Sequence, residues 1–409
     1  MTAPVELPPF RVIAAALRTT TDRLILEVVA PQETAPDWNE FEWAVARAVC
    51  ALQGIAGLLA TRLRWHGPRA FREFLATQHA HTLARHAQIG DLLAELDSTL
   101  GDAGIPFVPL KGSAIRVLPL HEAGERPQSD IDLLLDPSHL GDCKGLLERL
   151  GYELLMSVRR HDVYAPIARR EPRPYGEHPE NPLKIELHTR VSEVLPVERV
   201  DITATIPPAR PLPGANRYAS LAALVRHVCL HAAGNLQMNA VRFIQVHELA
   251  QLAARMSSAD WRELWGEGPV QSQAWWLYPP FALAARHVPG CVPADKLAKI
   301  RSVCPPRLRN RYEKVPFCDV SWSNLRIEAL PGHEWSRTVR DTLRFARSRL
   351  YRNRVAVDEA TVIYSAEPGL QAAPWSRAPQ LERILRWVFT RPPRTQTISA
   401  VTAALREAS

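Results

Sequence analysis

Hydrophobic positions change their spacing twice along the chain, and these changes separate helical segments from a mixed segment. Over residues 37–100, leucine and isoleucine recur at intervals of three and four, which predicts amphipathic helices. Asp37-x-x-Glu40 predicts a capping box at the start of the first of these helices. Residues 1–36 are mixed, and residues 24–29 fit either a short strand or a helix.

Between residues 106 and 191 the apolar runs become short and are bounded by glycine, proline and polar residues, which predicts strands. A helix is expected over residues 137–150, with Gly151 just beyond its last turn. A shorter helical stretch is expected over residues 114–118. The expected strands cover residues 106–110, 129–135, 152–158, 161–167 and 183–191.

After residue 214 the spacing becomes helical again, and apolar positions mark helices around residues 221–228 and 243–252. Two further amphipathic stretches occupy residues 381–389 and 398–405, and no period repeats along the chain. The pattern predicts an α+β fold, in which a small mixed β-sheet core is flanked by N- and C-terminal helical regions. The expected parts are a mostly helical region over 1–95, the core over 96–212, a helical domain over 213–350 and a helical tail over 351–409.

Composition and charge narrow the classes of ligand. The chain has 409 residues, 46% of them apolar, and a net charge of +7, which favours an anionic ligand. Acidic residues are spread throughout, and no basic block contains interleaved aromatics, so nucleic acid is not favoured. The charge fits nucleotide binding, although a general preference for arginine would produce it as well.

The cysteines, the N-terminal residues and the apolar runs together indicate in which cellular compartment the protein is expected. Six cysteines are scattered without a C-x-x-C pair, which predicts reduced and mostly buried thiols. The N-terminal residues lack the basic and apolar regions of a signal peptide. The longest nearly apolar run, residues 48–61, is too short to span a bilayer. We therefore expect a cytoplasmic protein with no membrane partner.

The segment Asp130-Ile131-Asp132 lies in a predicted strand. Successive side chains of a strand alternate between faces, so both carboxylates share one face and Ile131 points to the other. Two adjacent acids repel each other, and Mg²⁺ would compensate them while it binds phosphate oxygens. The alternative is a solvent-facing pair on an edge strand.

The segment Lys111-Gly112-Ser113 lies at a predicted turn from strand to helix. Gly112 allows the backbone to approach a phosphate, and the following helix offers N–H groups to an anion. Ser113 adds a hydroxyl. Lys111 fits a phosphate contact, or alternatively an exposed loop lysine.

The segment Lys184-Ile185-Glu186-Leu187-His188 also alternates, so Lys184, Glu186 and His188 share a face. Glu186 is a candidate third carboxylate opposite the aspartates. Three acids around two metal ions suit phosphoryl chemistry, and Glu186 also fits as the base that deprotonates an acceptor hydroxyl.

Together these motifs resemble the uncharacterised nucleotidyltransferase family of the polymerase-β-like superfamily. The resemblance covers roughly residues 85–250 and rests on Leu110-Lys111-Gly112, Arg126-Pro127-x-x-Asp130-Ile131-Asp132-Leu133-Leu134, Leu150-Gly151-Tyr152 and Ile185-Glu186-Leu187-His188. It implies a small mixed sheet flanked by helices, two Mg²⁺ ions and transfer of a nucleoside monophosphate from an NTP. We expect the metal and catalytic residues to be Asp130, Asp132 and Glu186, and the nucleotide-binding residues to be Lys111, Gly112, Ser113, Arg126 and His188.

Some of these residues have an alternative role. Arg126 fits either neutralisation of phosphate charge or a salt bridge that orients Asp130. His188 fits either direct catalysis or support of the acids. His227 and His231 have the i, i+4 spacing of a zinc pair, but contact with nucleotide or acceptor, or simple packing, fits them better.

Two other features are better explained without catalysis. The loop arginines Arg159, Arg160, Arg169, Arg170 and Arg173 fit either an anionic acceptor or a solvated loop, and the tryptophans fit helix packing. The P-loop pattern and the G-x-S-x-G pattern do not occur.

The expected activity is Mg²⁺-dependent transfer of NMP, with ATP as the expected donor, to a hydroxyl of a small molecule, glycan or peptide. The transfer would release pyrophosphate. The expected context is the biosynthesis of a modified peptide or polysaccharide. Two alternatives use the same site. One is a nucleotide-binding accessory or sensor protein with a pathway partner, and the other is a γ-phosphate kinase.

Overall fold

The computed structural model describes residues 8–157, 161–168, 176–266, 274–322 and 332–350, together with the single positions 385, 401 and 405. The basic loop residues Arg159, Arg160, Arg169, Arg170 and Arg173 lie outside these ranges. The helices expected over 381–389 and 398–405 also lie outside them, apart from the single positions.

Four helices form the N-terminal part: α1 (Phe10–Val29), α2 (Glu40–Gln53), α3 (Ala56–Arg62) and α4 (Arg69–Asp102). Residues 24–29 are therefore helical. The capping box predicted at Asp37 and Glu40 is wrong, because Asn39 caps α2. The Asn39 side chain accepts from the Glu42 N–H at 3.0 Å, and Glu42 accepts from the Asn39 N–H at 3.0 Å.

A mixed six-stranded sheet follows, in the order β3-β4-β5-β2-β1-β8. Its strands are β1 (Pro106–Pro109), β2 (Asp130–Leu135), β3 (Tyr152–Ser157), β4 (His161–Pro166), β5 (Lys184–His188) and β8 (Gly214–Ala215). β5 lies parallel to β2, and β1 lies antiparallel to β2 on its other side. The α+β class with a small mixed sheet between helical regions is confirmed.

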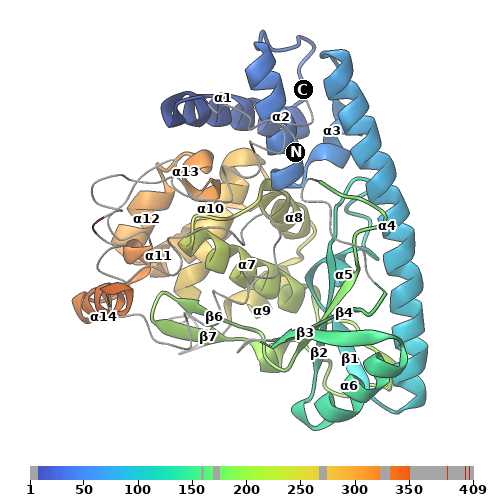
Figure 1. Ribbon diagram of the computed structural model, residues 1–409. Coiled ribbons are helices and arrows are strands. Elements are labelled where there is room, and N and C mark those ends of the chain that lie inside the picture. Colours follow the sequence, from blue (N-terminus) through green and yellow to red (C-terminus); the bar gives the residue numbers. More distant parts are fainter. Residues whose placement is uncertain are drawn as a thin grey trace.

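Each face of the sheet belongs to a different hydrophobic core. Ile131, Leu133 and Ile185 face α4 and α6 (Leu140–Arg149) in the smaller core. Val108 and Leu134 join a larger core that also contains residues of the N-terminal and C-terminal helices. Figure 1 shows α4 running along one side of the molecule, from the N-terminal helices to the sheet. The second face of the sheet therefore lies toward the helical regions.

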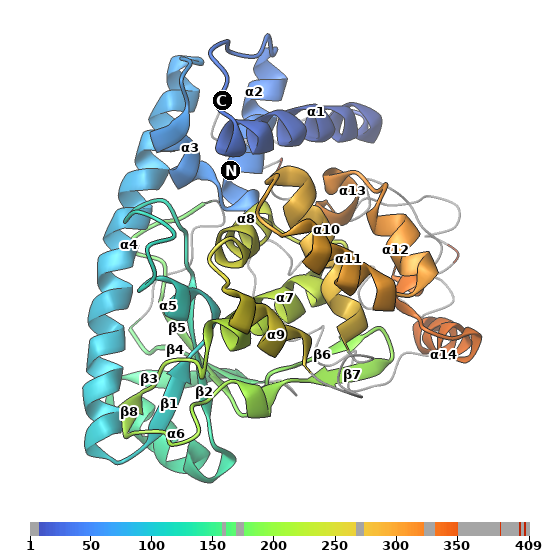
Figure 2. The ribbon, with the colours of Figure 1, turned by 180° about the vertical axis from the view of Figure 1, so that it is seen from behind.

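The helices after the sheet pack together on the side away from α4 (Figure 2). They are α7 (Leu221–Gln237), α8 (Phe243–Ala253), α9 (Ser258–Trp265), α10 (Tyr278–His287), α11 (Ala294–Val303), α12 (Pro306–Tyr312), α13 (Phe317–Ser321) and α14 (Val339–Leu350). A hairpin of β6 (Ser192–Leu195) and β7 (Glu198–Asp201) precedes them. The tryptophans of this part pack in the core, namely Trp261, Trp265, Trp275, Trp276, Trp322 and Trp335.

All six cysteines are buried free thiols. Within the described ranges, no single helix is long and apolar enough to cross a membrane. In the described part of the chain, one pair of successive helices, α2 and α3, is together long and apolar enough by length and composition alone, and the pair is bent by 113°.

Gly57 in α3 lies directly against backbone. A Cβ at this position would lie 2.2 Å from Gly124 O and 2.8 Å from Glu125 Cα, and backbone cannot swing aside as a flexible side chain does. We expect Gly57→Ala to lower the free energy of unfolding by about 1–3 kcal/mol, as measured by urea denaturation. Gly141→Ala in α6, where nothing lies within 4 Å, is the control and should not destabilise the protein. Equal stabilities of the two variants would contradict this packing.

His287 is a half-buried histidine at the end of α10. Its ring lies 5.9 Å from that of Phe243 and 5.4 Å from that of Phe317, between centroids. Burial, assisted by the charge of Arg286, lowers its pKa from 6.5 to about 4. The unfolded chain therefore takes up this proton first, and stability should fall by up to about 3 kcal/mol as the pH drops from 6.5 to 4. Melting curves across this range should show a weaker pH dependence in His287→Leu, but an unchanged one in the exposed-site control His66→Leu.

Candidate active site

Strands β2 and β5 bring three carboxylates to one face of the sheet. Asp130 and Asp132 alternate with the core residue Ile131, and Glu186 is the register partner of Asp132. Asp132 is only 3% exposed, and β2 lies between β1 and β5. The alternative of a solvent-facing pair on an edge strand is therefore wrong.

Lys111 is the first residue of α5 (Lys111–Ile115) and neutralises part of this acidic face. Its Nζ lies 2.7 Å from Asp132 Oδ1. The backbone supports this contact, because the Leu110 N–H donates to Asp132 O at 2.8 Å. Burial alone would lower the pKa of Lys111, but Asp132, Glu186 and Asp130 outweigh it and raise the pKa. The alternative of an exposed loop lysine is wrong.

Two histidines border the carboxylates. His188 Nε2 lies 2.9 Å from Asp132 Oδ1 and 3.4 Å from Glu186 Oε2. His161, at the start of β4, places its Nε2 3.4 Å from the same Glu186 oxygen. Sequence reasoning missed His161. Its strand was expected, but only the antiparallel register with β5, in which His161 pairs with His188, shows that the two share a face.

The two aspartates differ in their ease of ionisation. Burial and the nearby charges of Asp132 and Glu186 raise the pKa of Asp130 to about 7. Asp132 is also buried, but Lys111 and the hydrogen bond from His188 hold its pKa well below the usual range. Burial and repulsion from the neighbouring acids therefore oppose the ionisation of Asp130, and an additional cation would favour it.

Gly112 and Ser113 lie within the first turn of α5 and not in a turn before it. The Ser113 N–H donates to Leu110 O at 3.1 Å, and the Lys111 N–H donates to the Tyr218 hydroxyl at 3.4 Å. Two of the backbone N–H groups that were expected to bind an anion therefore already donate hydrogen bonds within the protein. The Ser113 hydroxyl accepts from Gln128 Nε2 at 2.9 Å and keeps its own proton available for donation.

Arg126 forms an ion pair with Glu248 of α8, not with Asp130 as the alternative interpretation expected. Its Nη2 lies 3.5 Å from Glu248 Oε2, and a second contact joins Nε to the other carboxylate oxygen. Burial would raise the pKa of Glu248, but Arg126 and His121 lower it to about 2. A Cβ at Gly112 would lie 2.5 Å from Arg126 Nη1, so glycine at this position allows the guanidinium to pack over α5.

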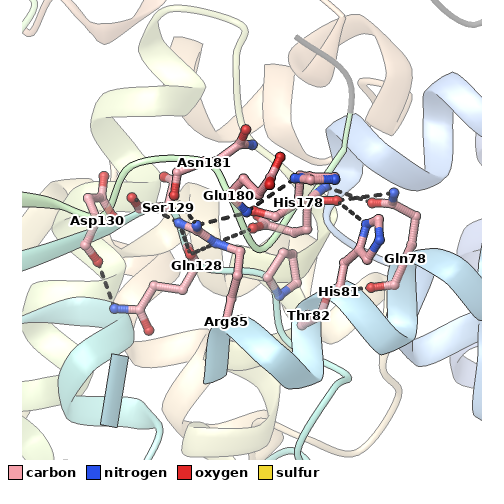
Figure 3. A network of polar contacts seen from close by, with 12 residues as sticks. Gln78, His81, Thr82, Arg85, Gln128, Ser129, Asp130, His178, Glu180 and Asn181 are labelled. Atoms are coloured by element: carbon pink, nitrogen blue, oxygen red, sulfur yellow. Dashed lines mark hydrogen bonds and ion pairs between the residues drawn. The ribbon is translucent and has the colours of Figure 1, made fainter. Parts of the chain in front are cut away.

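A buried arginine of α4, Arg85, fixes the segment that leads into β2 (Figure 3). Its guanidinium donates to the carbonyls of Gln128 at 3.3 Å and Asn181 at 2.7 Å. It also pairs with Glu177 at 2.8 Å. Gln128 in turn donates to Asp130 O at 2.7 Å. Arg85 therefore joins the loop before Asp130 to the loop before Glu186, and no sequence motif marks it.

His227 and His231, the two histidines of α7 with zinc-pair spacing, each contact a polar side chain nearby. His227 Nδ1 lies 2.7 Å from the hydroxyl of Tyr218. His231 Nε2 lies 3.3 Å from the amide of Asn235. Across the described ranges, the group able to hold a metal ion is His161, Glu186 and His188, so the i, i+4 pair does not supply a zinc site.

The mixed sheet flanked by helices, with acids on one face, defines the class of α+β nucleotidyltransferase folds. A family model described as "Uncharacterised nucleotidyltransferase" matches residues 39–273, more than half of the chain, and the chain belongs to this family. Membership supports a transferase that acts in nucleotidyl transfer. The match extends further in both directions than the expected 85–250. A search of curated proteins and a search of solved structures gave no match.

Proposed function

We propose that the protein transfers a nucleoside monophosphate from an Mg²⁺-bound NTP, with ATP as the expected donor, to a hydroxyl of a small molecule, glycan or peptide. The observation that carries this proposal is the convergence of Asp130, Asp132 and Glu186 on one sheet face, beside Lys111. Three carboxylates with two nearby cations, Lys111 and Arg126, suit a site that binds metal and triphosphate together.

The residues present fit divalent cations. The raised pKa of Asp130 reflects burial and repulsion between carboxylates, and a cation held by Asp130, Asp132 and Glu186 would relieve that repulsion. Bound Mg²⁺ would supply charge neutralisation of the triphosphate and activation of the acceptor hydroxyl.

The side chains around the acids have separate roles in this proposal. Lys111, once a cation takes over its contact with Asp132, is free to pair with a phosphate as a point charge. The Ser113 hydroxyl donates to a phosphate oxygen while its own oxygen accepts from Gln128. Arg126 adds positive charge near the phosphates, and Glu248 holds it in place. His188 contacts Asp132 and so fixes the orientation of this carboxylate.

In the reaction, the acceptor oxygen forms a bond to the α-phosphorus while the bond from that phosphorus to pyrophosphate breaks. The hydroxyl proton passes to a carboxylate oxygen of Glu186, which lies on the same face as the aspartates. The bridging oxygen leaves with pyrophosphate and keeps the electron pair of the broken bond. Most of the rate enhancement comes from positioning and charge neutralisation.

The test uses NTPs labelled at either the α- or the γ-phosphate, incubated with the protein, Mg²⁺ and fractions of small molecules, glycans or peptides. Incorporation of the α-label together with pyrophosphate release supports the proposal. Incorporation of the γ-label alone would show a kinase that uses the same site. Magnesium-dependent nucleotide binding, measured by thermal shift, with no transfer of either label would show an accessory or sensor protein.

A further inference from the structure

Two histidines and a glutamate aim three metal-binding atoms at one point beside the aspartates. Nε2 of His161 and Nε2 of His188 each lie 3.4 Å from Glu186 Oε2. One ligand atom from each of the three residues lies within 4.8 Å of the other two. The imidazole rings are 4.7 Å apart between centroids and inclined by 35°. These atoms converge because β4, β5 and β2 lie side by side with their polar side chains on one face.

The spacing matches that of ligands around one small ion. A tetrahedral ion with ligand bonds of about 2.0–2.1 Å holds neighbouring ligand atoms about 3.4 Å apart. Both nitrogen–oxygen distances to Glu186 already have this value. The third separation, between the ligand nitrogens of the two imidazoles, is within 4.8 Å.

The chemistry of the ligands selects the kind of ion. Mg²⁺ prefers oxygen ligands and keeps much of its water, whereas imidazole nitrogen suits zinc and its neighbours in the first transition series. We infer that His161, Glu186 and His188 bind a divalent transition metal, with Zn²⁺ as the ion that fits best. The imidazole nitrogens would therefore make this site selective for a transition metal, whereas a site formed by the aspartates alone would favour Mg²⁺.

The position adjoins the aspartates through one contact. Asp132 Oδ1 lies 2.9 Å from His188 Nε2, so a metal on His188 would lie next to this carboxylate. A metal ion on Nε2 of His188 would replace the hydrogen bond between this nitrogen and Asp132. The inference deepens the proposed function, because Glu186 serves both, but metal binding by these three residues requires no nucleotide.

The experiment is a Co²⁺ titration of the full chain after removal of metals with a chelator, without nucleotide. Co²⁺ replaces Zn²⁺ in such sites and absorbs visible light strongly when four-coordinate. We expect a saturable visible band that Zn²⁺ abolishes and excess Mg²⁺ leaves in place. His161→Gln should weaken Co²⁺ binding by about 100-fold, whereas His66→Gln, at an exposed position, should bind as the wild type does.

A second variant separates loss of a ligand from loss of the fold. His161→Glu replaces nitrogen with oxygen, so it should bind Co²⁺ more weakly than the wild type does. The ratio of Co²⁺ affinity to Mn²⁺ affinity should fall, while the far-ultraviolet circular dichroism stays native. Wild-type Co²⁺ affinity in a folded His161→Gln protein would overturn the inference, as would displacement of Co²⁺ by Mg²⁺ as readily as by Zn²⁺. Transfer of the α-label without a Co²⁺ site would refute the inference alone, and a Co²⁺ site without transfer would refute the proposed function alone.

Discussion

Asp132→Asn is expected to reduce nucleotidyl transfer by at least about 1,000-fold while the protein remains folded. Asp132 is the central carboxylate of the site, because Lys111 and His188 both contact its Oδ1. Asparagine preserves the shape of the side chain but removes the charge that would hold a cation. The measurement is incorporation of the α-label from NTP, accompanied by a thermal-shift titration with NTP and Mg²⁺. Both the transfer and the Mg²⁺-dependent shift should disappear.

The matched control for this variant is Asp136→Asn, one residue beyond the same strand. Asp136 is exposed, and its carboxylate accepts from the Ser138 N–H at 2.9 Å. It should change transfer by less than about twofold, because surface substitutions of this kind have small effects. Full transfer by a folded Asp132→Asn protein would end the assignment of this face as the active site.

The part of the site that could be predicted from sequence depends on local periodicity. Alternation along β2 and β5 places Asp130, Asp132 and Glu186 on polar faces, and the structure shows that the two strands are neighbours. The same reasoning placed the strands β1 to β5 and the helix α6 close to their observed positions. Strand and helix patterns are readable because they depend on residues only two to four positions apart.

The remaining features depend on contacts between distant segments. Arg126 and Glu248 are 122 positions apart, and nothing near either residue indicates the other. Arg85 acts on loops 43 and 96 positions away. The hairpin of β6 and β7 escaped prediction because its strands are four residues long and mostly polar. The capping error at Asp37 had a local cause, since Asn39 offers the same chemistry two residues later.

Glu248→Gln is expected to lower the free energy of unfolding by about 3–5 kcal/mol, because it leaves the guanidinium of Arg126 in the interior without its carboxylate partner. The Glu248 side chain is 4% exposed and that of Arg126 is 17% exposed, so water cannot compensate the lost charge. Urea unfolding measures the change. The effect should exceed that of removing an exposed pair such as Arg69 with Glu73, because solvent screens the charges of such a pair.

A double-mutant cycle separates the structural role of Arg126 from its proposed contact with phosphate. Arg126→Met combined with Glu248→Leu removes both charges, so stability should return to within about 1–2 kcal/mol of the wild type. If Arg126 also contacts the triphosphate, the stable double variant should still bind NTP more weakly than the wild type does. Additive destabilisation by the two single changes would show that the ion pair is not coupled. Wild-type NTP affinity in the double variant would limit Arg126 to joining α8 to the loop before β2, and would leave Lys111 as the nearest cation for the phosphates.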